Sequence, residues 1–367
     1  MKRILAALLA LVMVMALCAC SSEPAAPSAP SAPSAPADPA APSAPAEPEV
    51  DDTVYTLRFA TTESEVTVRY KMLEKPLMDL ITEKSGGRIQ FQFFPSSSLA
   101  GSGAIFKGMQ DGICDIGMDN INSYPGVYLY SELMATPGIY LGNDFDTKAV
   151  NMKAFVDAYA IDEYKQNGLY LLGTFPAVET VLMTKFPIET TADFAGKTFC
   201  CNANYAKMFE DQNGATTWIV PPEQYEALHL SVIDATVNGA GPLSAFKLFE
   251  VLDYAYYVPF ATITSTYCIS QKTYESLPSD LQQVLDEVRD SEEFRAINKA
   301  YVEAMMGDVA AACAEGNPEF LFADLPADVA AAMQASCSAT VDAKLAELNA
   351  AGKDADGIKA LFDSFAE

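Results

Sequence analysis

The sequence predicts an α/β fold divided into two lobes. Segments that alternate apolar and polar residues, as strands do, are interspersed with segments that repeat apolar residues every three or four positions, as helices do. Of the 367 residues, the first 50 have an abnormal composition, and the other 317 exceed what one hydrophobic core usually organises. Two lobes of mixed strand and helix are therefore expected.

The first predicted unit is strand, helix, strand. Residues 54–60 and 88–93 alternate in the manner of strands, and the helical pattern between them runs through Leu73, Leu77 and Ile81 until Ser85-Gly86-Gly87 stops it. This order places parallel strands side by side with the helix on one face of the sheet.

The alternation continues along the chain. A helical pattern at 105–113 leads to a strand at 115–118. Further apolar strands are predicted at 169–173, 180–183, 198–201, 216–220 and 235–238.

A long helix is predicted from about Asp280 to Glu315, with Ser279 as its cap. At 1.5 Å per residue it would measure about 54 Å, which is longer than a small domain is wide, so it would contact both lobes. The alternative is a pair of helices separated near Ser291 or Gly307.

The charge balance argues against a nucleic-acid partner. The chain has 49 acidic and 23 basic residues, a net charge of −26 and one histidine, whereas a polyphosphate requires a cationic surface. Hydrophobic residues make up 50% and aromatic residues 10%, which is enough for a real core.

The N-terminus predicts an export signal, residues 1–19. Lys2 and Arg3 precede an apolar run from Ile4 to Ala19, which is shorter than the roughly 20 residues of a membrane-spanning helix, the alternative reading. Leu17-Cys18-Ala19-Cys20 resembles a bacterial lipobox, which implies cleavage before Cys20 and acylation of its sulfur. The alternative is an ordinary signal peptide with a chance cysteine.

Residues 20–50 then form a predicted tether. From Pro24 to Pro48 a proline stands at every third position, nine in all, which fits a polyproline II spacer. Such a spacer would reach about 75 Å from the membrane. A ligand for proline-binding domains is the alternative.

The cysteines do not indicate a metal site. Six cysteines follow the tether and permit 15 pairings, which spacing alone does not resolve: Cys114, Cys200, Cys201, Cys268, Cys313 and Cys337. The sequence contains no C-x-x-C or H-x-x-x-H set, so neither a metal nor another cofactor is expected.

Several ordered motifs resemble one family. Glu83 to Ile89 is followed by Phe94-Pro95-Ser96-Ser97-Ser98-Leu99-Ala100-Gly101, and Asp193-Phe194-Ala195-Gly196-Lys197 by Pro222 to Leu228, Val232 to Asn238, and Tyr274-Glu275-Ser276-Leu277-Pro278. Over about residues 54–325 the chain resembles DctP-type solute-binding proteins of TRAP (tripartite ATP-independent periplasmic) transporters.

The resemblance implies a two-lobed type II periplasmic-binding-protein-like fold with a long helix spanning both lobes. Lobe I would comprise 51–173 plus about 260–297, and lobe II 174–259 plus about 298–367. It also implies a small-molecule ligand in the cleft between the lobes, delivered to a separate TRAP membrane permease that an ion gradient drives. The protein would be extracytoplasmic and anchored to the membrane only by lipid.

The positions of the family's substrate-binding arginines differ here. Family members hold a carboxylate with an arginine at the end of the strand after the Gly-Lys pair, where this chain has Cys200, and often with a second one, where it has Thr180. A thiol and a hydroxyl cannot replace a guanidinium. The organic acid usual in the family is therefore in question, and a neutral, zwitterionic or cationic ligand is the hypothesis.

Other candidate ligand-binding residues follow from the same resemblance. Asn238 occupies the family's polar position, with a structural turn as the alternative, and Trp218 lies where members place an aromatic ring over the ligand, with core packing as the alternative. Phe175 and Tyr205 would be further aromatic walls. Glu179 would select a cation in the cleft or be a solvated strand-end acid. Thr62 and Asn120 match polar positions of the first lobe in some members.

Catalysis is not expected. The only histidine, His229, lies in an apolar helical pattern that suggests packing or capping, and the sequence has no G-x-S-x-G or P-loop motif. Cys200 and Cys201 have no basic neighbour in sequence to lower a thiol pKa. A lipoprotein that presents its ligand to a signalling receptor is the remaining alternative to transport, ahead of an exported hydrolase.

Overall fold

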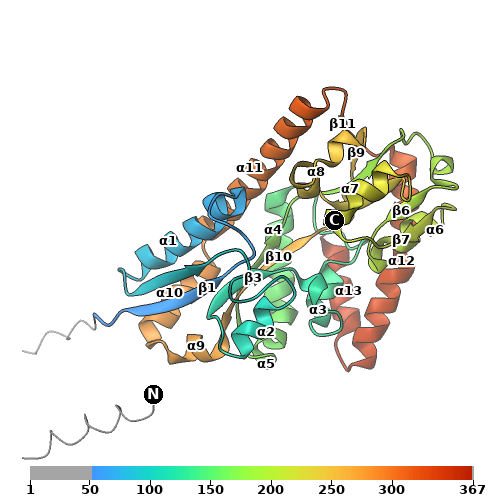
Figure 1. The fold of residues 1–367 in the computed structure, drawn as a ribbon. Coiled ribbons are helices and arrows are strands. Elements are labelled where there is room, and N and C mark those ends of the chain that lie inside the picture. Colours follow the sequence, from blue (N-terminus) through green and yellow to red (C-terminus); the bar gives the residue numbers. More distant parts are fainter. Residues whose placement is uncertain (1–51, 366–367) are drawn as a thin grey trace, which may run out of the picture. The chain divides into compact units, whose positions relative to one another are not determined.

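Two β-sheets organise the protein, and the computed structural model describes residues 52–365 of it (Figure 1). The predicted signal peptide, the lipidation site Cys20 and the tether lie outside these described residues. The first sheet has the order β2 (Ile89–Phe94), β1 (Tyr55–Ala60), β3 (Ile116–Asp119), β10 (Thr264–Ser270) and β4 (Leu169–Pro176). The second has the order β11 (Leu321–Asp324), β9 (Tyr254–Tyr257), β5 (Thr180–Thr184), β8 (Ala235–Gly239), β6 (Thr198–Cys200) and β7 (Ala215–Thr217).

The predicted strand–helix–strand unit is confirmed. β1 pairs in parallel with β2 from Tyr55 opposite Ile89 to Ala60 opposite Phe94, and with β3 on its other side. β10 is antiparallel to both β3 and β4, so β1 to β4 all point the same way and end at one edge of the sheet. That edge is where α/β sheets place their ligands.

Helices cover both faces of the first sheet. Both faces are apolar, since successive residues of β1 point to opposite sides: Phe59 packs into one hydrophobic cluster and Ala60 into the cluster on the other side. The helical segments in this part of the chain are η1 (Tyr70–Glu74), α1 (Lys75–Lys84), α2 (Ile105–Gln110), η2 (Ile121–Ser123), α3 (Leu129–Met134), α4 (Phe145–Phe155), η3 (Val156–Ala160), α5 (Ile161–Gln166), α9 (Gln271–Ser276) and α10 (Ser279–Arg289).

The second sheet has its own two clusters. Val181 and Leu182, neighbours on β5, pack into different ones. The helical segments between its strands are η4 (Thr191–Phe194), η5 (Ala203–Tyr205), α6 (Ala206–Glu210), α7 (Pro221–His229), α8 (Gly241–Ala245) and η6 (Leu248–Glu250). The chain passes from the first sheet to the second between β4 and β5 and returns between β9 and β10.

The single helix predicted from Asp280 to Glu315 is wrong, and the alternative with a break near Ser291 is correct. The chain forms α10 and then α11 (Glu292–Gly316). Ser291 has an extended backbone and its side chain accepts a hydrogen bond from the Phe294 amide, so it caps a new helix instead of continuing the old one.

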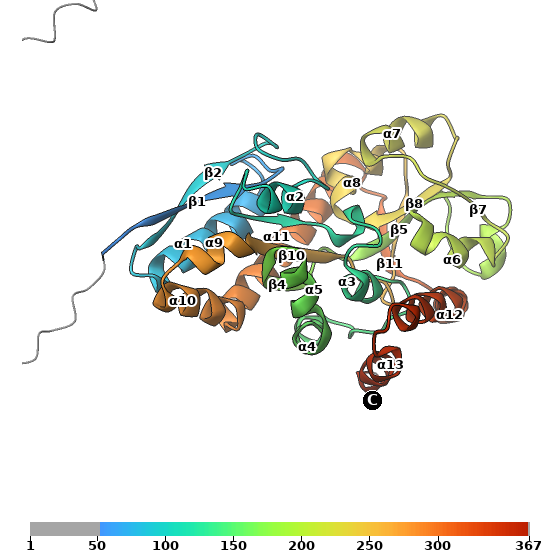
Figure 2. The ribbon, with the colours of Figure 1, turned by 90° about the horizontal axis from the view of Figure 1, so that it is seen from below.

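α11 alone nevertheless reaches both sheets. Its first half buries Phe294 and Tyr301 in a cluster of the first sheet, and its second half buries Val309 and Cys313 in a cluster of the second (Figures 1 and 2). Its 25 residues correspond to about 38 Å, which is long enough for this role.

The C-terminal helices also contact both clusters, which departs from the predicted assignment of 298–367 to lobe II. α12 (Ala327–Ala350) packs Val329 and Met333 with the second sheet's cluster but Leu345 and Leu348 with the first sheet's. α13 (Ala355–Ser364) returns fully to the first cluster, where its Phe362 ring stacks on Phe155 of α4 at 4.7 Å. At 24 residues, α12 is long enough to bridge the two.

Candidate functional site

Polar side chains gather at the carboxyl edge of the first sheet. Thr62 follows β1, Asp119 ends β3, and Asn120 comes directly after it. They face a cavity of about 190 Å³, named the first cavity here. Its wall consists of Thr62, Arg69, Ser102, Met118, Asp119, Asn120, Ala177, Val178, Ile263, Thr264, Ser265 and Tyr301.

A second cavity of about 370 Å³ adjoins the first and extends to the second sheet. The two cavities share Ser102, Asn120 and Ile263. The rest of the second cavity is formed by Ser123, Asn202, Tyr205, Trp218, Pro221, Val237 and Asn238. The two together form a cleft with one wall from each sheet.

Asp119 organises the floor of the first cavity. One of its carboxylate oxygens accepts from the Gly103 amide at 2.9 Å and from the Tyr124 hydroxyl at 2.6 Å. The other accepts from the Asn120 amide at 2.9 Å. Both oxygens are therefore engaged in holding the loop before α2 against the end of β3.

Arg69 brings a cation into the first cavity. It lies just before η1, which packs against α11, so its guanidinium sits between the strand ends and Tyr301. Its Nη2 is 2.8 Å from a carboxylate oxygen of Glu63. Burial by itself lowers the pKa of Arg69, but Tyr301 and Glu63 more than offset it, so the pKa lies above the usual value and the group stays charged.

Glu74 is a buried carboxyl beside this cation. Thr61 donates to its Oε1 at 2.6 Å, while Oε2 has no hydrogen-bond partner among the described residues. Burial raises the pKa of Glu74 to about 7, although Arg69 and Thr61 act in the opposite direction. This carboxyl titrates close to neutral pH.

The second cavity combines aromatic rings with amides. Trp218, directly after β7, is 52% exposed, so a large apolar ring is open to solvent at the mouth of the cleft. Tyr205 is buried behind it at the end of η5, whose cap is Asn202. Asn238 in β8 lines the cavity, and its side-chain oxygen accepts from the Gly239 amide at 2.8 Å.

Five of the nine predicted ligand-binding residues thus come together. Asn238, Trp218, Tyr205 and Asn120 line the second cavity, and Thr62 joins Asn120 in the first. The other four lie elsewhere.

Cys200 and Thr180, the positions matched to the family's arginines, lie inside the second sheet. Cys200 is fully buried in a hydrophobic cluster, where its sulfur accepts from the Ile219 amide at 3.3 Å and from the Gln224 side chain at 3.4 Å. Thr180 is 2% exposed. Neither residue lines either cavity of the cleft.

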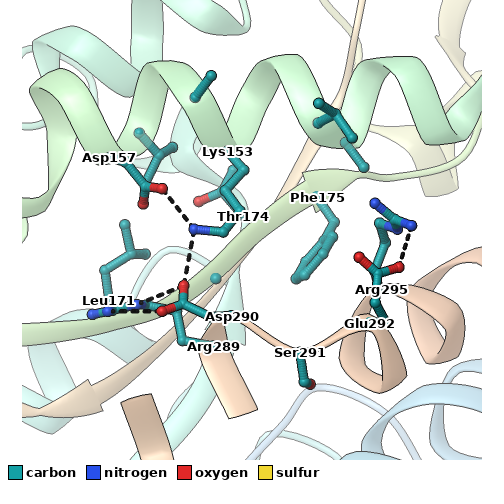
Figure 3. A pocket seen from close by; sticks show the side chains of 15 residues that line it. Lys153, Asp157, Leu171, Thr174, Phe175, Arg289, Asp290, Ser291, Glu292 and Arg295 are labelled. Carbon is teal, nitrogen blue, oxygen red and sulfur yellow. Dashed lines mark hydrogen bonds and ion pairs between the residues drawn. The ribbon is translucent and has the colours of Figure 1, made fainter. Parts of the chain in front are cut away.

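Phe175 faces a different cavity, on the side of the first sheet where α4 and the start of α11 meet (Figure 3). It packs edge-on against Phe294 at 4.8 Å. Around it, Lys153 pairs with Asp157 and Asp290, and Arg289 also pairs with Asp290 (Figure 3). Phe175 is therefore a core residue of the first sheet and no wall of the cleft.

Glu179 also lies outside the cleft. It lines a separate cavity with Tyr257 and Asp324, and its carboxylate is 3.3 Å from the ammonium of Lys148. The Lys148 side chain is 5% exposed. The charge of Glu179 is thus already paired with that of Lys148. Glu179 is neither the predicted cation selector of the cleft nor a purely solvated acid.

Sequence reasoning missed Arg69 and Thr264. The hypothesis of a neutral, zwitterionic or cationic ligand considered only the arginine positions at Cys200 and Thr180, whereas Arg69 brings a cation to the cleft from elsewhere. The chain has only six arginines. The feature of the sequence that could have indicated Arg69 was an arginine inside the apolar pattern Val68-Arg69-Tyr70. Thr264 carried no signal, because only the crossing between β9 and β10 brings it to the cavity.

The residues considered for catalysis are not arranged for it. His229 is exposed at the end of α7, stacked with Tyr225, and lines neither cavity. The six cysteines of the described chain are buried and form no disulfide, and burial raises the pKa of Cys201 to about 12. Within residues 52–365 no cluster of three potential metal ligands occurs, and no helix there has the length and apolarity to cross a membrane.

Comparison with protein families gives an extensive match. The sequence model of the family described as DctP, bacterial extracellular solute-binding protein, family 7, matches residues 59–350.

Individual relatives are similar over part of their length. The ectoine/5-hydroxyectoine-binding periplasmic protein UehA of Ruegeria pomeroyi is 29% identical over 207 residues, which is 53% of this chain and 59% of that protein. The 2,3-diketo-L-gulonate-binding periplasmic protein YiaO of Escherichia coli is 26% identical over 237 residues, 63% of this chain and 70% of that protein. The match thus covers less than two thirds of the Ruegeria protein.

Solved structures share the fold. A TRAP periplasmic solute-binding protein from Desulfovibrio salexigens superimposes with a TM-score of 0.74 at 19% identity, covering 86% of this chain and 96% of that one. Another from the same organism, with bound orotic acid, has a TM-score of 0.71 at 21% identity and covers 85% of this chain and 99% of that one. One from Rhodoferax ferrireducens, in complex with copurified benzoate, has a TM-score of 0.69 at 21% identity and covers 85% of this chain and 99% of that one. The predicted two-lobed periplasmic-binding fold is confirmed.

Proposed function

The chain belongs to bacterial extracellular solute-binding protein family 7, and on this basis we propose that it is an extracytoplasmic receptor for a small organic solute. The solute binds in the cleft formed by the first and second cavities. The receptor then delivers it to a TRAP membrane permease, which takes it up with an ion gradient.

One observation carries this proposal. Asn120 from the first sheet and Trp218, Tyr205 and Asn238 from the second line a single cavity, although they lie far apart in the sequence. A concave site with aromatic walls and a few polar groups is typical of small-molecule binding. Segments that cross between two sheets also allow such lobes to close on a solute.

The organic nature of the solute is supported by the relatives. The two bacterial relatives are named for ectoine and for 2,3-diketo-L-gulonate, and the similar structures hold orotic acid or benzoate. The family consists of binding proteins, and we propose no enzymatic activity for this chain. We further propose that an acyl group on Cys20 and the proline-rich tether hold the receptor at the outer face of the membrane.

Native mass spectrometry and thermal-shift measurements test the receptor function. The freshly purified protein is expected to carry a small solute or to gain thermal stability with at least one member of a metabolite library. Trp218→Ala and Asn238→Ala are each expected to weaken that binding about 10-fold or more, because they remove an aromatic wall and an amide hydrogen bond.

The matched control is Asn349→Ala, an exposed amide on α12 far from the cleft, which should bind as the parent protein does. A protein that binds no solute, or whose solute binding is insensitive to both cleft substitutions, would contradict the proposal.

A further inference from the structure

We infer that the solute of this cleft is uncharged: a small hydroxylated ring, such as a sugar, a cyclitol or a nucleoside, that lies against Trp218 and is hydrogen-bonded by neutral side chains of both walls. This inference rests on the proposed receptor function and names the ligand class of the same cleft.

The cation of the first cavity is already neutralised. Nη2 of Arg69 lies 2.8 Å from a carboxylate oxygen of Glu63, and the buried carboxyl of Glu74 is close enough to act on the same guanidinium. The cavity and the acid paired with it carry a positive charge on Arg69 and negative charges on Glu63 and Asp119. An anionic solute would add another negative charge to this group and would compete with Glu63 for its partner, which disfavours it.

The anion of the first cavity is satisfied as well. Asp119 is 4% exposed, and one of its oxygens accepts from the Gly103 amide and the Tyr124 hydroxyl, while the other accepts from the Asn120 amide. A cationic solute would have to break hydrogen bonds that hold the loop before α2. The carboxylate therefore serves the fold and is not free to bind a cation.

The second cavity adds no charge. Among the described residues, its wall has no charged side chain, and Glu179, the acid that the sequence suggested for a cation, lies in a different cavity and pairs with Lys148. A charged solute would leave water for a cleft in which no charge lacks a partner, and this transfer is costly. A neutral polar solute needs only hydrogen bonds there.

Thr264 is an independent indication of a neutral polar ligand. It is 1% exposed, lines the first cavity, and its hydroxyl has no hydrogen-bond partner among the described residues. A buried hydroxyl without a partner is costly in a native structure. Because a hydroxyl both donates and accepts, a hydroxyl group of the solute can complete it without any charge.

Two amides of the second cavity also favour oxygen-rich solutes. The side-chain oxygens of Asn202 and Asn238 already accept from the backbone amides of Asn204, at 3.2 Å, and of Gly239, at 2.8 Å. The part of each side chain that remains for a solute is its NH2 group, which is a donor. Hydroxyl and carbonyl oxygens of the solute are the acceptors that match these donors.

Trp218 indicates the shape of the solute. This ring is 52% exposed and lines the second cavity together with Tyr205 and Val237. An exposed aromatic side chain on the wall of a cavity is typical of a ligand contact. A ring with apolar faces and polar edges can cover the indole with a face and present its oxygens to the amides.

The test begins with native mass spectrometry of the full chain to identify the retained solute, followed by calorimetry once that solute has been removed. The neutral probes are glucose, xylose, myo-inositol and uridine, and uridine separates nucleosides from sugars and cyclitols. Their charged counterparts are glucuronate, glucosamine and uridine 5′-monophosphate, and benzamide is a neutral ring without hydroxyl groups. The retained solute is expected to be neutral, and benzamide and the charged counterpart of each hit should bind about 10-fold more weakly or less.

Two substitutions in the cleft test the neutral hydrogen bonds. Thr264→Val keeps the shape and removes the hydroxyl, so it should weaken a neutral hit about 5-fold without lowering the thermal stability of the solute-free protein. Asn238→Asp keeps the shape but replaces the NH2 donor with a carboxylate, and it should weaken the same hit about 10-fold or more. Thr82→Val, the same substitution at a partly exposed site of α1 outside the cleft, is the control and should bind as the parent protein does.

The outcomes separate the ligand class from the receptor function. A charged retained solute, charged probes that bind more tightly than their neutral counterparts, or neutral hits unchanged in both Thr264→Val and Asn238→Asp overturn the ligand class but leave the receptor function standing. The absence of any retained solute and of any hit, here and in the metabolite library, overturns the receptor function itself.

Discussion

The two walls of the cleft are built from different chemistry. The wall from the first sheet carries the charges, Arg69 and Asp119, with hydroxyl groups around them, whereas the wall from the second carries rings and amides, including Trp218 and Asn238. On the second sheet, the two positions that the family resemblance matched to arginines hold a buried thiol and a buried hydroxyl, those of Cys200 and Thr180.

The charges of the cleft therefore come from one wall and its rings and amides mainly from the other. A cation is useful wherever it reaches the solute and is partly shielded from water. In this chain Arg69, just before η1, lines the first cavity, whereas Cys200 faces the core.

The largest effect on stability is expected from Cys200→Arg, which tests whether this position of the second sheet faces the core. The new guanidinium would be forced into a hydrophobic cluster without a partner, so the free energy of unfolding should fall by about 4 kcal/mol and much of the protein should not fold. Chemical denaturation monitored by circular dichroism measures the change. Cys200→Ala, the matched control, should cost only about 1 kcal/mol. A stable Cys200→Arg protein that binds dicarboxylates would show that this position faces the cleft after all.

A smaller, pH-dependent effect on stability is expected from Glu74→Gln, at the buried carboxyl beside Arg69. Burial raises the pKa of Glu74 from its usual 4.5 to about 7, so the unfolded chain loses this proton at lower pH than the folded protein does. The contribution of Glu74 to stability is therefore full below pH 4.5 and declines as the pH rises to 7. Glutamine stays neutral, so the variant should match the parent protein near pH 4.5 and exceed it by on the order of 2 kcal/mol at pH 8.

Urea denaturation at the two pH values measures that difference. Glu163→Gln is a useful parallel, because burial also raises the pKa of Glu163 to about 7, at a site in the first sheet's helices that does not line the cleft. It should show the same pH trend without altering solute affinity. An advantage of Glu74→Gln that is equal at both pH values would contradict this account.

The smallest effect on stability is expected from Glu179→Gln, which tests whether the cleft extends to the cavity of Glu179. Because Glu179 is about a third exposed and pairs with Lys148, its loss should lower the free energy of unfolding by about 1 kcal/mol. Solute affinity, measured by calorimetry, should stay within about twofold. Asp324→Asn, on the same cavity but unlike Glu179 exposed at a strand end, is the control. A selective loss of cationic solutes in Glu179→Gln would extend the cleft to this cavity.

Local patterns were reliable where one face of an element is buried. The strands β1 and β2 were predicted from alternation, because side chains on a strand point to opposite faces. The prediction of a single long helix was wrong at Ser291, where the apolar spacing continues but the serine caps a new helix. The strands β9, β10 and β11 were not predicted, and in β10, where every residue is buried, no alternation marks the strand.

The site was predicted only in part for a related reason. Asn238, Trp218, Tyr205, Asn120 and Thr62 were found because the family resemblance fixes positions along strands. Phe175 was misplaced because its strand has two faces that the motifs do not distinguish, and all eight residues of β4 are buried.

The amino-acid pattern was enough to indicate the α/β class, the family and several aromatic and amide side chains of one wall of the cleft. The packing of the two sheets determined that Arg69 and Thr264 line the first cavity and that Glu179 pairs with Lys148 outside the cleft. The physical reason is that local side-chain periodicity sets which face of an element is buried, whereas a binding site depends on segments far apart in the chain that only the packing of two sheets brings together.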